Sequence, residues 1–546
     1  MRSRAKYFVM RSLLPLALAA LVMLPRLASP QFGLLDDGLT LQTGREVSGR
    51  WSSVLYLIPE TGRFFPAYWL VYSLVFALVG ARPLAFFVVN VLLLAGLLAM
   101  LGRIARLAGA TREQAVVAAV LFAVSGPAVE TFYTLSKAEP LQLTWIALSL
   151  IATAAAVTAA RPLTRVALPA LAAVAVLLAH ATKETSVVLV PIAVAWLAIE
   201  WWSPTRSPKW MRFAAVYVLV NLVALAAFAA LRSHYAALAL GEGSYTRAYV
   251  LHAVTVGPAL FRICAWLVRG FAYLLPLLAL AALPRVGVGS RRPIAYAGVW
   301  MAGWLAVFLP WPATFEYYLL PFTFGAALLG GLLVGDAWRW RGPGQPAARR
   351  RLASFALAAA ALLWLVATTN AATDARVQLA VDRANADLVD FLGGLPERSR
   401  VLANMSPANE YHYELPMHLA ELKARGDIVI ERMPATGNVR PDFVVTAELA
   451  NQPGPTVRIA LYEPRVRQDN VTLRTLVAAD VAPVYRSERQ ARIVELGLQR
   501  LLCPLAVPPV LDVSYCPADR GVLDRRTFRY GWQVHRLVRP TAGRPT

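Results

Sequence analysis

Two adjacent carboxylates stand just after the first hydrophobic segment of this chain. Residues 34–38 are Leu-Leu-Asp-Asp-Gly, a few positions beyond an apolar run at 12–29. A carboxylate at this place can accept a proton from a hydroxyl group that reaches the membrane surface. The alternative is local structure, because Asp and Gly are common in turns and Asp is common at the start of helices. Asp36 and Asp37 are therefore reactive groups or turn and capping residues.

A second charged segment lies between two later apolar runs, at 114–130 and 141–160. It reads Thr134-Leu-Ser-Lys-Ala-Glu-Pro-Leu141 and contains Lys137 and Glu139. One interpretation is that Glu139 lines the same site as the Asp36–Asp37 pair. The other is an exposed ion pair on a short loop, which contributes little to stability.

Lys183 lies between the apolar runs at 166–181 and 185–202, with His180 and Glu184 close by. Ionisable residues near membrane depth are costly and usually have a partner or a function. The alternative for Lys183 is a boundary residue whose side chain extends to the membrane surface. For His180, a packed and hydrogen-bonded histidine is the more common case.

Arg262 and Arg269 share one face of a helix predicted within the apolar run 258–282. Seven residues at about 100° each bring the two side chains within about 20° of each other, and they lie about 10.5 Å apart along the axis. Two arginines on one stripe of an apolar helix should face a cavity and not lipid. Their partner is either a bound anion or an ion pair with Glu316 or aspartates.

Hydrophobic helices must position these residues. The chain has 546 residues, of which 58% are hydrophobic, against about 45–50% in soluble domains. Apolar runs long enough to cross about 30 Å of hydrocarbon recur along its first two thirds. The sequence therefore predicts a polytopic α-helical membrane protein with about eleven transmembrane helices, at 12–29, 84–101, 114–130, 141–160, 166–181, 185–202, 213–231, 258–282, 294–310, 317–335 and 352–370.

The formal net charge of +22 follows the membrane topology and does not indicate nucleic-acid binding. If the N-terminus is inside, Arg and Lys are concentrated in the inside segments, as the positive-inside rule requires. The lipid bilayer is thus an expected partner of the chain. In this orientation Asp36 and Asp37 lie outside the cytoplasm. An odd number of spans also leaves the C-terminal part outside.

The chain is expected to divide into a membrane module, residues 1–370, and an extracytoplasmic α/β domain, residues 371–546. The first outer loop, 30–83, contains a short apolar helix at 66–80 that suits the membrane interface. In the C-terminal part, helical segments at 382–393 and 409–425 alternate with strand-like segments at 400–403, 427–431 and 443–446, which favours a partly parallel sheet. A disulfide between Cys503 and Cys516 fits an oxidising compartment, and two free cysteines are the alternative.

The order of these segments resembles the N-terminal part of GT-C membrane glycosyltransferases, in the branch of protein O-mannosyltransferases and bacterial aminoarabinose transferases. In that branch an acidic pair in the first outer loop precedes a Pro-Leu-Tyr-Tyr-Trp-like helix, here Pro66-Ala-Tyr-Trp-Leu70, and a span that ends in Arg, here Gly102-Arg103. Ala181-Thr-Lys-Glu-Thr185 and Glu316-Tyr-Tyr-Leu-Leu-Pro321 resemble later signatures. The resemblance covers residues 10–335, and each motif alone is weak.

The resemblance implies transfer of a sugar from a polyprenyl-phosphate donor to an unidentified acceptor hydroxyl at the bacterial inner membrane. It implies that Asp36 is the base, that Glu139 lines the site, and that Asp37 binds the acceptor or a metal or caps a helix. The substrate-binding residues are then Lys183, Lys137, Arg262, Arg269 and His180, with the lipid phosphate as the anion that the basic residues meet. No cofactor is certain, and a divalent cation stays open.

The sequence also departs from the family pattern. The acidic pair is Asp-Asp where Asp-Glu is usual, and Glu316 stands where Arg is common, so no phosphate-binding role transfers to position 316. The alternatives from other classes are a multi-span transporter or lipid flippase and a non-catalytic scaffold with the same architecture. A transporter should show paired broken helices or symmetry between halves, and neither is clear in the sequence.

Overall fold

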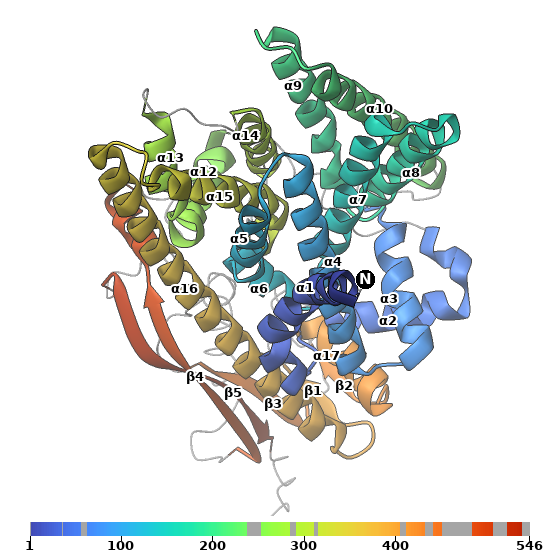
Figure 1. Ribbon diagram of the computed structural model, residues 1–546. Helices are drawn as coiled ribbons and strands as arrows, with labels where there is room; N and C mark the ends of the chain where they lie inside the picture. Colours follow the sequence, from blue (N-terminus) through green and yellow to red (C-terminus); the bar gives the residue numbers. More distant parts are fainter. Residues whose placement is uncertain are drawn as a thin grey trace, which may run out of the picture.

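The computed structural model describes residues 2–34, 36–55, 63–236, 253–283, 291–310, 315–403, 411–431, 441–449, 483–505 and 521–537. Helices form most of the described chain, and a sheet lies at one end of the bundle (Figure 1). The helices of the bundle are α1 (Arg2–Ala28), α2 (Asp37–Gly49), α3 (Pro66–Val79), α4 (Pro83–Leu107), α5 (Arg112–Ala123), α6 (Gly126–Tyr133), α7 (Glu139–Thr158), α8 (Pro162–His180), α9 (Leu189–Trp202), α10 (Pro208–Ala236), α12 (Ala253–Phe271), α13 (Leu274–Ala282), α14 (Arg291–Ala306), α15 (Leu320–Trp340) and α16 (Ala347–Gly393), with the 3-10 helices η1 (Trp51–Leu55), η2 (Glu184–Val188) and η3 (Glu316–Leu319).

Each of the eleven predicted spans coincides with a helix or a pair of helices. Among the described residues, seven helical segments are long and apolar enough to cross a membrane, and two bent pairs bring the number to nine. The remaining two predicted spans fall on α1 and α14. In α1 the described apolar part, Leu13–Ala28, is shorter than a full span.

Two predicted spans, 114–130 and 258–282, are not continuous helices. The first is broken between α5 and α6 with a bend of 57°, and the second between α12 and α13 with a bend of 91°. A proline follows each break, Pro127 and Pro276. Because proline has no N–H to donate to the fourth residue before it, each of these positions lacks one helical hydrogen bond, which makes a bend less costly there. At the first break, Ser125 caps the new helix by accepting the N–H of Ala128.

The described part of the predicted first outer loop, residues 30–83, is largely helical. The predicted interfacial helix 66–80 is α3, which begins at Pro66 and ends before Gly80, whose φ of 66° combined with a ψ of −159° favours a residue without a Cβ. The helix α2 was not predicted; it packs on α3 so closely that a Cβ on Gly44 would lie 2.9 Å from the Cβ of Phe76. The position of α3 at the membrane surface stays a prediction.

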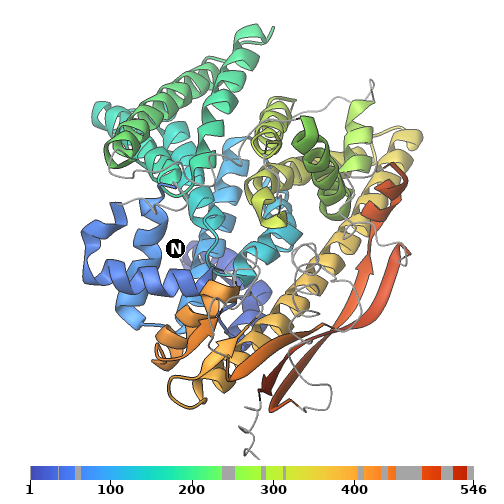
Figure 2. The ribbon, with the colours of Figure 1, turned by 180° about the vertical axis from the view of Figure 1, so that it is seen from behind.

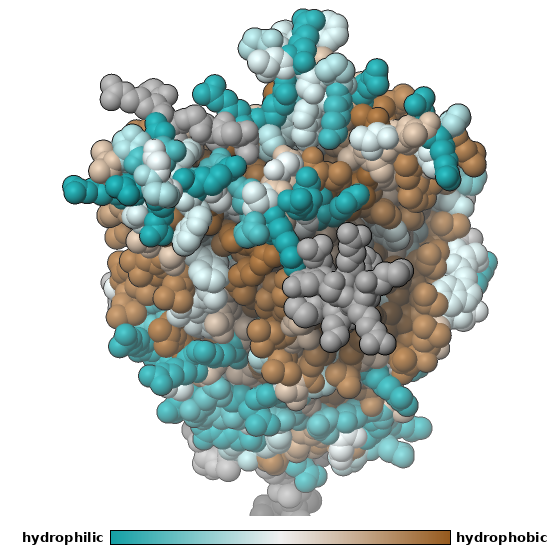
Figure 3. Space-filling model, in the orientation of Figure 1, coloured by the Kyte–Doolittle hydropathy of each residue, from teal (hydrophilic) through white to brown (hydrophobic). Residues whose placement is uncertain are grey.

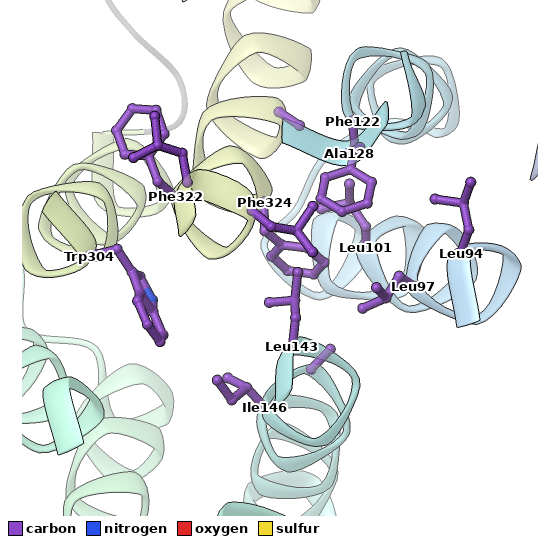
Figure 4. Close-up of a cluster of buried hydrophobic side chains, with 14 of the residues drawn as sticks. Leu94, Leu97, Leu101, Phe122, Ala128, Leu143, Ile146, Trp304, Phe322 and Phe324 are labelled. Atoms are coloured by element: carbon purple, nitrogen blue, oxygen red, sulfur yellow. The ribbon is translucent and has the colours of Figure 1, made fainter. Parts of the chain in front are cut away.

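On the face shown in Figure 3, hydrophobic residues form a belt between two hydrophilic ends. Beneath the belt, helices separated in sequence share one core. Leu94, Leu97 and Leu101 of α4 lie beside Phe122 of α5 and Phe324 of α15 (Figure 4). This core holds the helices that carry the charged loops in fixed positions.

The helix α16 joins the bundle to the C-terminal sheet. It runs for 47 residues, so the domain boundary expected at 370 falls inside a continuous helix, and the predicted helix 382–393 is its last part. The core shared with the sheet includes Val377, Val381 and Leu388. In its second half, α16 is tied to the end of α1 by a buried ion pair between Arg26 and Asp382.

The C-terminal domain contains the predicted α/β arrangement. Its elements are β1 (Arg400–Leu402), α17 (Tyr411–Lys423), β2 (Val429–Glu431), β3 (Phe443–Leu449), β4 (Tyr485–Leu496), η4 (Leu498–Leu505) and β5 (Leu523–Arg536). The sheet order is β2-β1-β3-β5-β4; β1 is parallel to β2 and β3, whereas β5 is antiparallel to β3 and β4. The expected partly parallel sheet is confirmed, and the long β4–β5 pair that lies along α16 in Figures 1 and 2 was not predicted.

Cys503 in η4 is disulfide-bonded. Its predicted partner, Cys516, lies outside the described residues.

Candidate functional site

Four chain segments far apart in sequence meet at one end of the bundle. They are the turn before α2, the α6–α7 loop, the α8–η2 loop and η3. These segments carry Asp36, Lys137, Lys183 and the tyrosines Tyr317 and Tyr318, respectively. The predicted topology placed all four segments on the same side of the membrane, and the structure brings the four segments into contact.

Asp36 is the accessible carboxylate of this group. Its Oδ2 lies 3.4 Å from Nζ of Lys137, and its side chain is 39% exposed whereas that of Lys137 is 5% exposed. Its backbone is left-handed, with φ of 67°, and its side chain does not cap α2. Asp36 therefore presents a carboxylate to solvent beside a buried ammonium group.

Asp37 points the other way, into the protein. Its Oδ2 accepts the N–H of Gly33 at 2.7 Å, and its Oδ1 accepts the hydroxyl of Ser136 at 2.9 Å. Burial, against the Gly33 hydrogen bond, raises the pKa of Asp37 from 3.8 to about 7, and the nearby Asp382 and Glu414 also raise it. Asp37 thus braces the turn that carries Asp36.

Glu139 and Lys183 form a buried ion pair at the start of α7. Nζ of Lys183 also lies 4.4 Å from the ring centre of Tyr318, and Nζ of Lys137 lies 4.6 Å from that of Tyr317, so both ammonium groups face aromatic rings. Burial lowers the pKa of Lys183, and the Glu139 carboxylate opposes that shift. Lys183 is therefore buried and paired with a carboxylate of α7.

The loop around Lys183 is tied to its neighbours on both sides. The amide of Gln142 in α7 donates to Oγ of Ser186 at 2.7 Å and to Oγ1 of Thr185 at 3.1 Å. On the other side, the N–H of Ala67 in α3 donates to the carbonyl of Ala181 at 3.0 Å. The aromatic helix α3 and the Thr-Lys-Glu segment are therefore one structural unit.

Glu414 is a buried acid of this site that the sequence did not reveal. It belongs to α17 of the C-terminal domain, and its Oε2 and Oε1 accept the N–H groups of Gly38 and Leu39 at 2.6 and 3.2 Å. Burial, with the charge of Asp36, raises the pKa of Glu414 to about 8, whereas burial lowers the pKa of the adjacent His418 to about 4. The sequence predicted the helix α17, but no local pattern in the sequence indicates that it packs against α2.

Arg269 is held by three acidic side chains. Its Nη1 lies 3.0 Å from Glu316, its Nη2 2.7 Å from Asp374, and its Nε 3.2 Å from Glu495. The sequence analysis gave two alternatives for the partner of Arg269, a bound anion or ion pairs with acidic side chains. The structure shows ion pairs. Arg262 is half-buried on the same helix, α12, which packs against α16 and η4.

His180 is buried at the end of α8, and its ring stacks on Phe228 of α10 at 5.4 Å. Neither ring nitrogen has a hydrogen-bond partner within the described chain. His180 is thus a packed histidine, as the second interpretation of the sequence expected, but it lacks the hydrogen bond expected with that interpretation.

The described residues contain no group of three or more His, Cys, Asp or Glu side chains arranged to hold a metal ion.

The fold is similar to that of a solved oligosaccharyltransferase from Archaeoglobus fulgidus tethered with an acceptor peptide. The TM-score is 0.50 at 11% identity, covering 84% of this chain and 68% of that chain. ArnT from Cupriavidus metallidurans aligns with a TM-score of 0.49 at 14% identity in the apo state, over 97% of this chain and 98% of that chain. The structure of the same protein bound to undecaprenyl phosphate aligns with a TM-score of 0.46 at 13% identity, over 95% of this chain and 97% of that chain. No family model and no curated protein matches the sequence. The similarity to the oligosaccharyltransferase shows the fold alone, and that fold is the GT-C architecture predicted from the order of the segments.

Proposed function

We propose that this protein is a membrane glycosyltransferase that moves a sugar from a polyprenyl-phosphate donor to an acceptor hydroxyl on the outer side of the membrane. The observation that carries the proposal is Asp36, an accessible carboxylate beside buried Lys137 and near the Glu139–Lys183 pair. The shared fold with an oligosaccharyltransferase supports this reaction class.

In this reaction Asp36 accepts the proton of the acceptor hydroxyl as its oxygen attacks the anomeric carbon. The new bond joins that oxygen to the sugar, and the bond between the anomeric carbon and the phosphate oxygen breaks. The electron pair of the broken bond stays on the lipid phosphate, which leaves with one more negative charge. A positioned base of this kind contributes about 10²–10⁴-fold to the rate.

Lys137 and Lys183 are the cations proposed to meet the phosphate. Both are buried, and both face the tyrosine pair of η3, so their charges act in a region with little water. Glu139 keeps Lys183 in place and lines the site, and Asp37 holds the Asp36 turn. Arg269 holds η3 in place through its ion pair with Glu316. We propose no substrate contact for Arg262 or His180.

The decisive experiment measures transfer by the purified protein from a panel of radiolabelled polyprenyl-phosphate sugars, chosen from the envelope glycans that a deletion strain loses. Asp36→Asn should reduce kcat about 100-fold or more, because the amide keeps the size of the side chain but cannot take up the proton. Glu46→Gln is the matched control, because Glu46 is an exposed carboxylate of α2 that accepts the amide of Gln42. Normal turnover in Asp36→Asn would remove the proposed base, and equal losses in both variants would indicate damage to α2.

The outer location of the site is tested separately with reporter fusions. Alkaline phosphatase fused after residue 546 should be active, whereas a fluorescent protein that cannot fold after export should be dark. The opposite pattern would place the site in the cytoplasm and would contradict a lipid-linked donor on the outer face.

A further inference from the structure

The N-terminus of α2 is capped from another domain. The residue at the N-cap position is Asp36, and an aspartate there ordinarily accepts the N–H of the second or third helical residue. In this chain those residues are Gly38 and Leu39, and both N–H groups donate to Glu414. Glu414 lies 376 residues away from Gly38, so the cap comes from the C-terminal domain.

The helices α17 and α2 approach each other closely at Gly38. A Cβ on Gly38 would lie 2.8 Å from Oε2 of Glu414, 2.8 Å from Cδ2 of His418 and 3.0 Å from Cβ of Met417. Only glycine leaves room for α17 to approach. The glycine of the Asp-Asp-Gly segment is therefore explained by the docking of the second domain.

The cap has a consequence for Asp36. Because Glu414 satisfies the N–H groups of Gly38 and Leu39, the Asp36 carboxylate has no capping bond to make. It is left beside Lys137 and exposed to solvent. Without Glu414, the N–H groups of Gly38 and Leu39 would lose their acceptor, and Asp36 stands at the helix position whose side chain ordinarily caps them.

We propose that Glu414 is a positioning residue for the transfer reaction. It acts as a substitute cap for α2 and so keeps the Asp36 carboxylate available as the base. This inference rests on the proposed function. It assigns to the C-terminal domain a direct part in organising the site, through a single side chain and two backbone N–H groups.

The test compares Glu414→Ala with a control on the same two helices. In Glu414→Ala, Asp36 should turn to cap α2, and kcat should fall about tenfold, in line with the strength of a helix cap. The KM for the lipid-linked donor should change much less than kcat, because the side chains of Lys137 and Lys183 are kept. Glu414→Gln keeps one acceptor oxygen, so its kcat should fall less than that of Glu414→Ala. The control is Glu421→Gln, which removes the ion pair to Arg45 of α2, 2.7 Å long, but leaves the cap in place; it should retain the parent kcat.

Two further measurements separate positioning from general destabilisation. Hydrogen exchange of the Gly38 and Leu39 amides should change in Glu414→Ala, where these N–H groups change their acceptor, but not in Glu421→Gln, where the cap is kept; this readout needs no activity. In the Asp36→Asn background, Glu414→Ala should cause no further loss of kcat, because it acts through Asp36.

The outcomes also distinguish this inference from the proposed function. An active parent with an inactive Asp36→Asn and a normal Glu414→Ala would overturn the inference alone. An equal loss of kcat in Glu421→Gln would overturn it too, since docking in general would then be the cause. A parent that transfers no sugar would overturn the proposed function, whereas the exchange measurement would still show whether Glu414 caps α2.

Discussion

Two charged clusters lie on either side of η3, and they differ in how their charges are used. The lysine cluster consists of Lys137, Lys183, Asp36 and Glu139; the arginine cluster consists of Arg269, Glu316, Asp374 and Glu495. Consecutive residues of η3 connect them, because Glu316 belongs to one cluster and the ring of Tyr317 faces the other.

In the arginine cluster every side chain is at most 11% exposed, and each guanidinium nitrogen has a carboxylate partner. In the lysine cluster Asp36 is 39% exposed and the lysines face aromatic rings as well as carboxylates. Buried charge alone therefore does not identify a reactive site. A charge that remains accessible beside buried charges of the opposite sign is the more informative feature.

The largest effect is expected from Arg269→Met. This change leaves three buried carboxylates without their shared cation, and the loss of one partner of a buried ion pair costs about 3–5 kcal/mol. Unfolding in one detergent, followed by heat or denaturant, measures the loss. The control is Arg489→Met, which breaks an exposed pair with Asp387 between β4 and α16 and should cost less than about 1 kcal/mol. Weaker binding of polyprenyl phosphate at unchanged stability would instead assign Arg269 to the donor site.

The next effect separates the two adjacent aspartates. Asp36→Asn should lower kcat about 100-fold, whereas Asp37→Asn should stay within about threefold of the parent. The amide at position 37 can still accept the N–H of Gly33 and can donate to the Ser136 hydroxyl, so the turn is preserved. Steady-state kinetics on both purified variants decide the question. An inactive Asp37→Asn with a normal Asp36→Asn would move the base by one residue.

A smaller effect tests the lysines. Lys183→Gln alone would leave Glu139 buried without a partner, so the informative variant is Lys183→Gln with Glu139→Gln, which removes both charges. Its affinity for polyprenyl phosphate should fall by about 1.5–3 kcal/mol, the usual contribution of a charge-assisted hydrogen bond. Lys137→Gln should weaken binding by a similar amount. Parent-like affinity in both proteins would place the phosphate elsewhere.

Sequence reasoning succeeded where the signal was local. Apolar runs located the helices of the bundle, and the strand-like segments at 400–403, 427–431 and 443–446 became β1, β2 and β3. It failed where proline broke an apolar run, because hydropathy alone does not show whether the chain bends at Pro127 or Pro276. It also missed β4, whose sequence Tyr485-Arg-Ser-Glu-Arg-Gln490 is too polar at its start to indicate a strand before its partners are known.

The candidate site shows the same division. The segments with Asp36, Lys137 and Lys183 were recognised because each follows or precedes a span in a fixed order. Glu414 was not, because the contact that defines its role joins α17 to a helix 376 residues earlier. The choice between an anion and carboxylates around Arg269 likewise depended on Asp374 and Glu495, which no periodicity of α12 could reveal.

The smallest effect concerns the pH dependence of folding around Asp37 and Glu414. Their pKa values are raised in the folded protein, from 3.8 to about 7 and from 4.5 to about 8, so the folded state keeps protons that the unfolded state releases. The contribution of each group to stability is therefore greatest below its unfolded pKa and declines as pH rises to the folded value. The buried His418 acts in the opposite direction, but only between its folded pKa of about 4 and its ordinary value of 6.5. The melting temperature should accordingly fall between pH 6.5 and 8, and this fall should be smaller in Asp37→Asn and in Glu414→Gln than in the parent. Other titrating groups are common to all three proteins and cancel in the comparison, so parallel melting curves across this range would show that neither acid keeps its proton in the folded site.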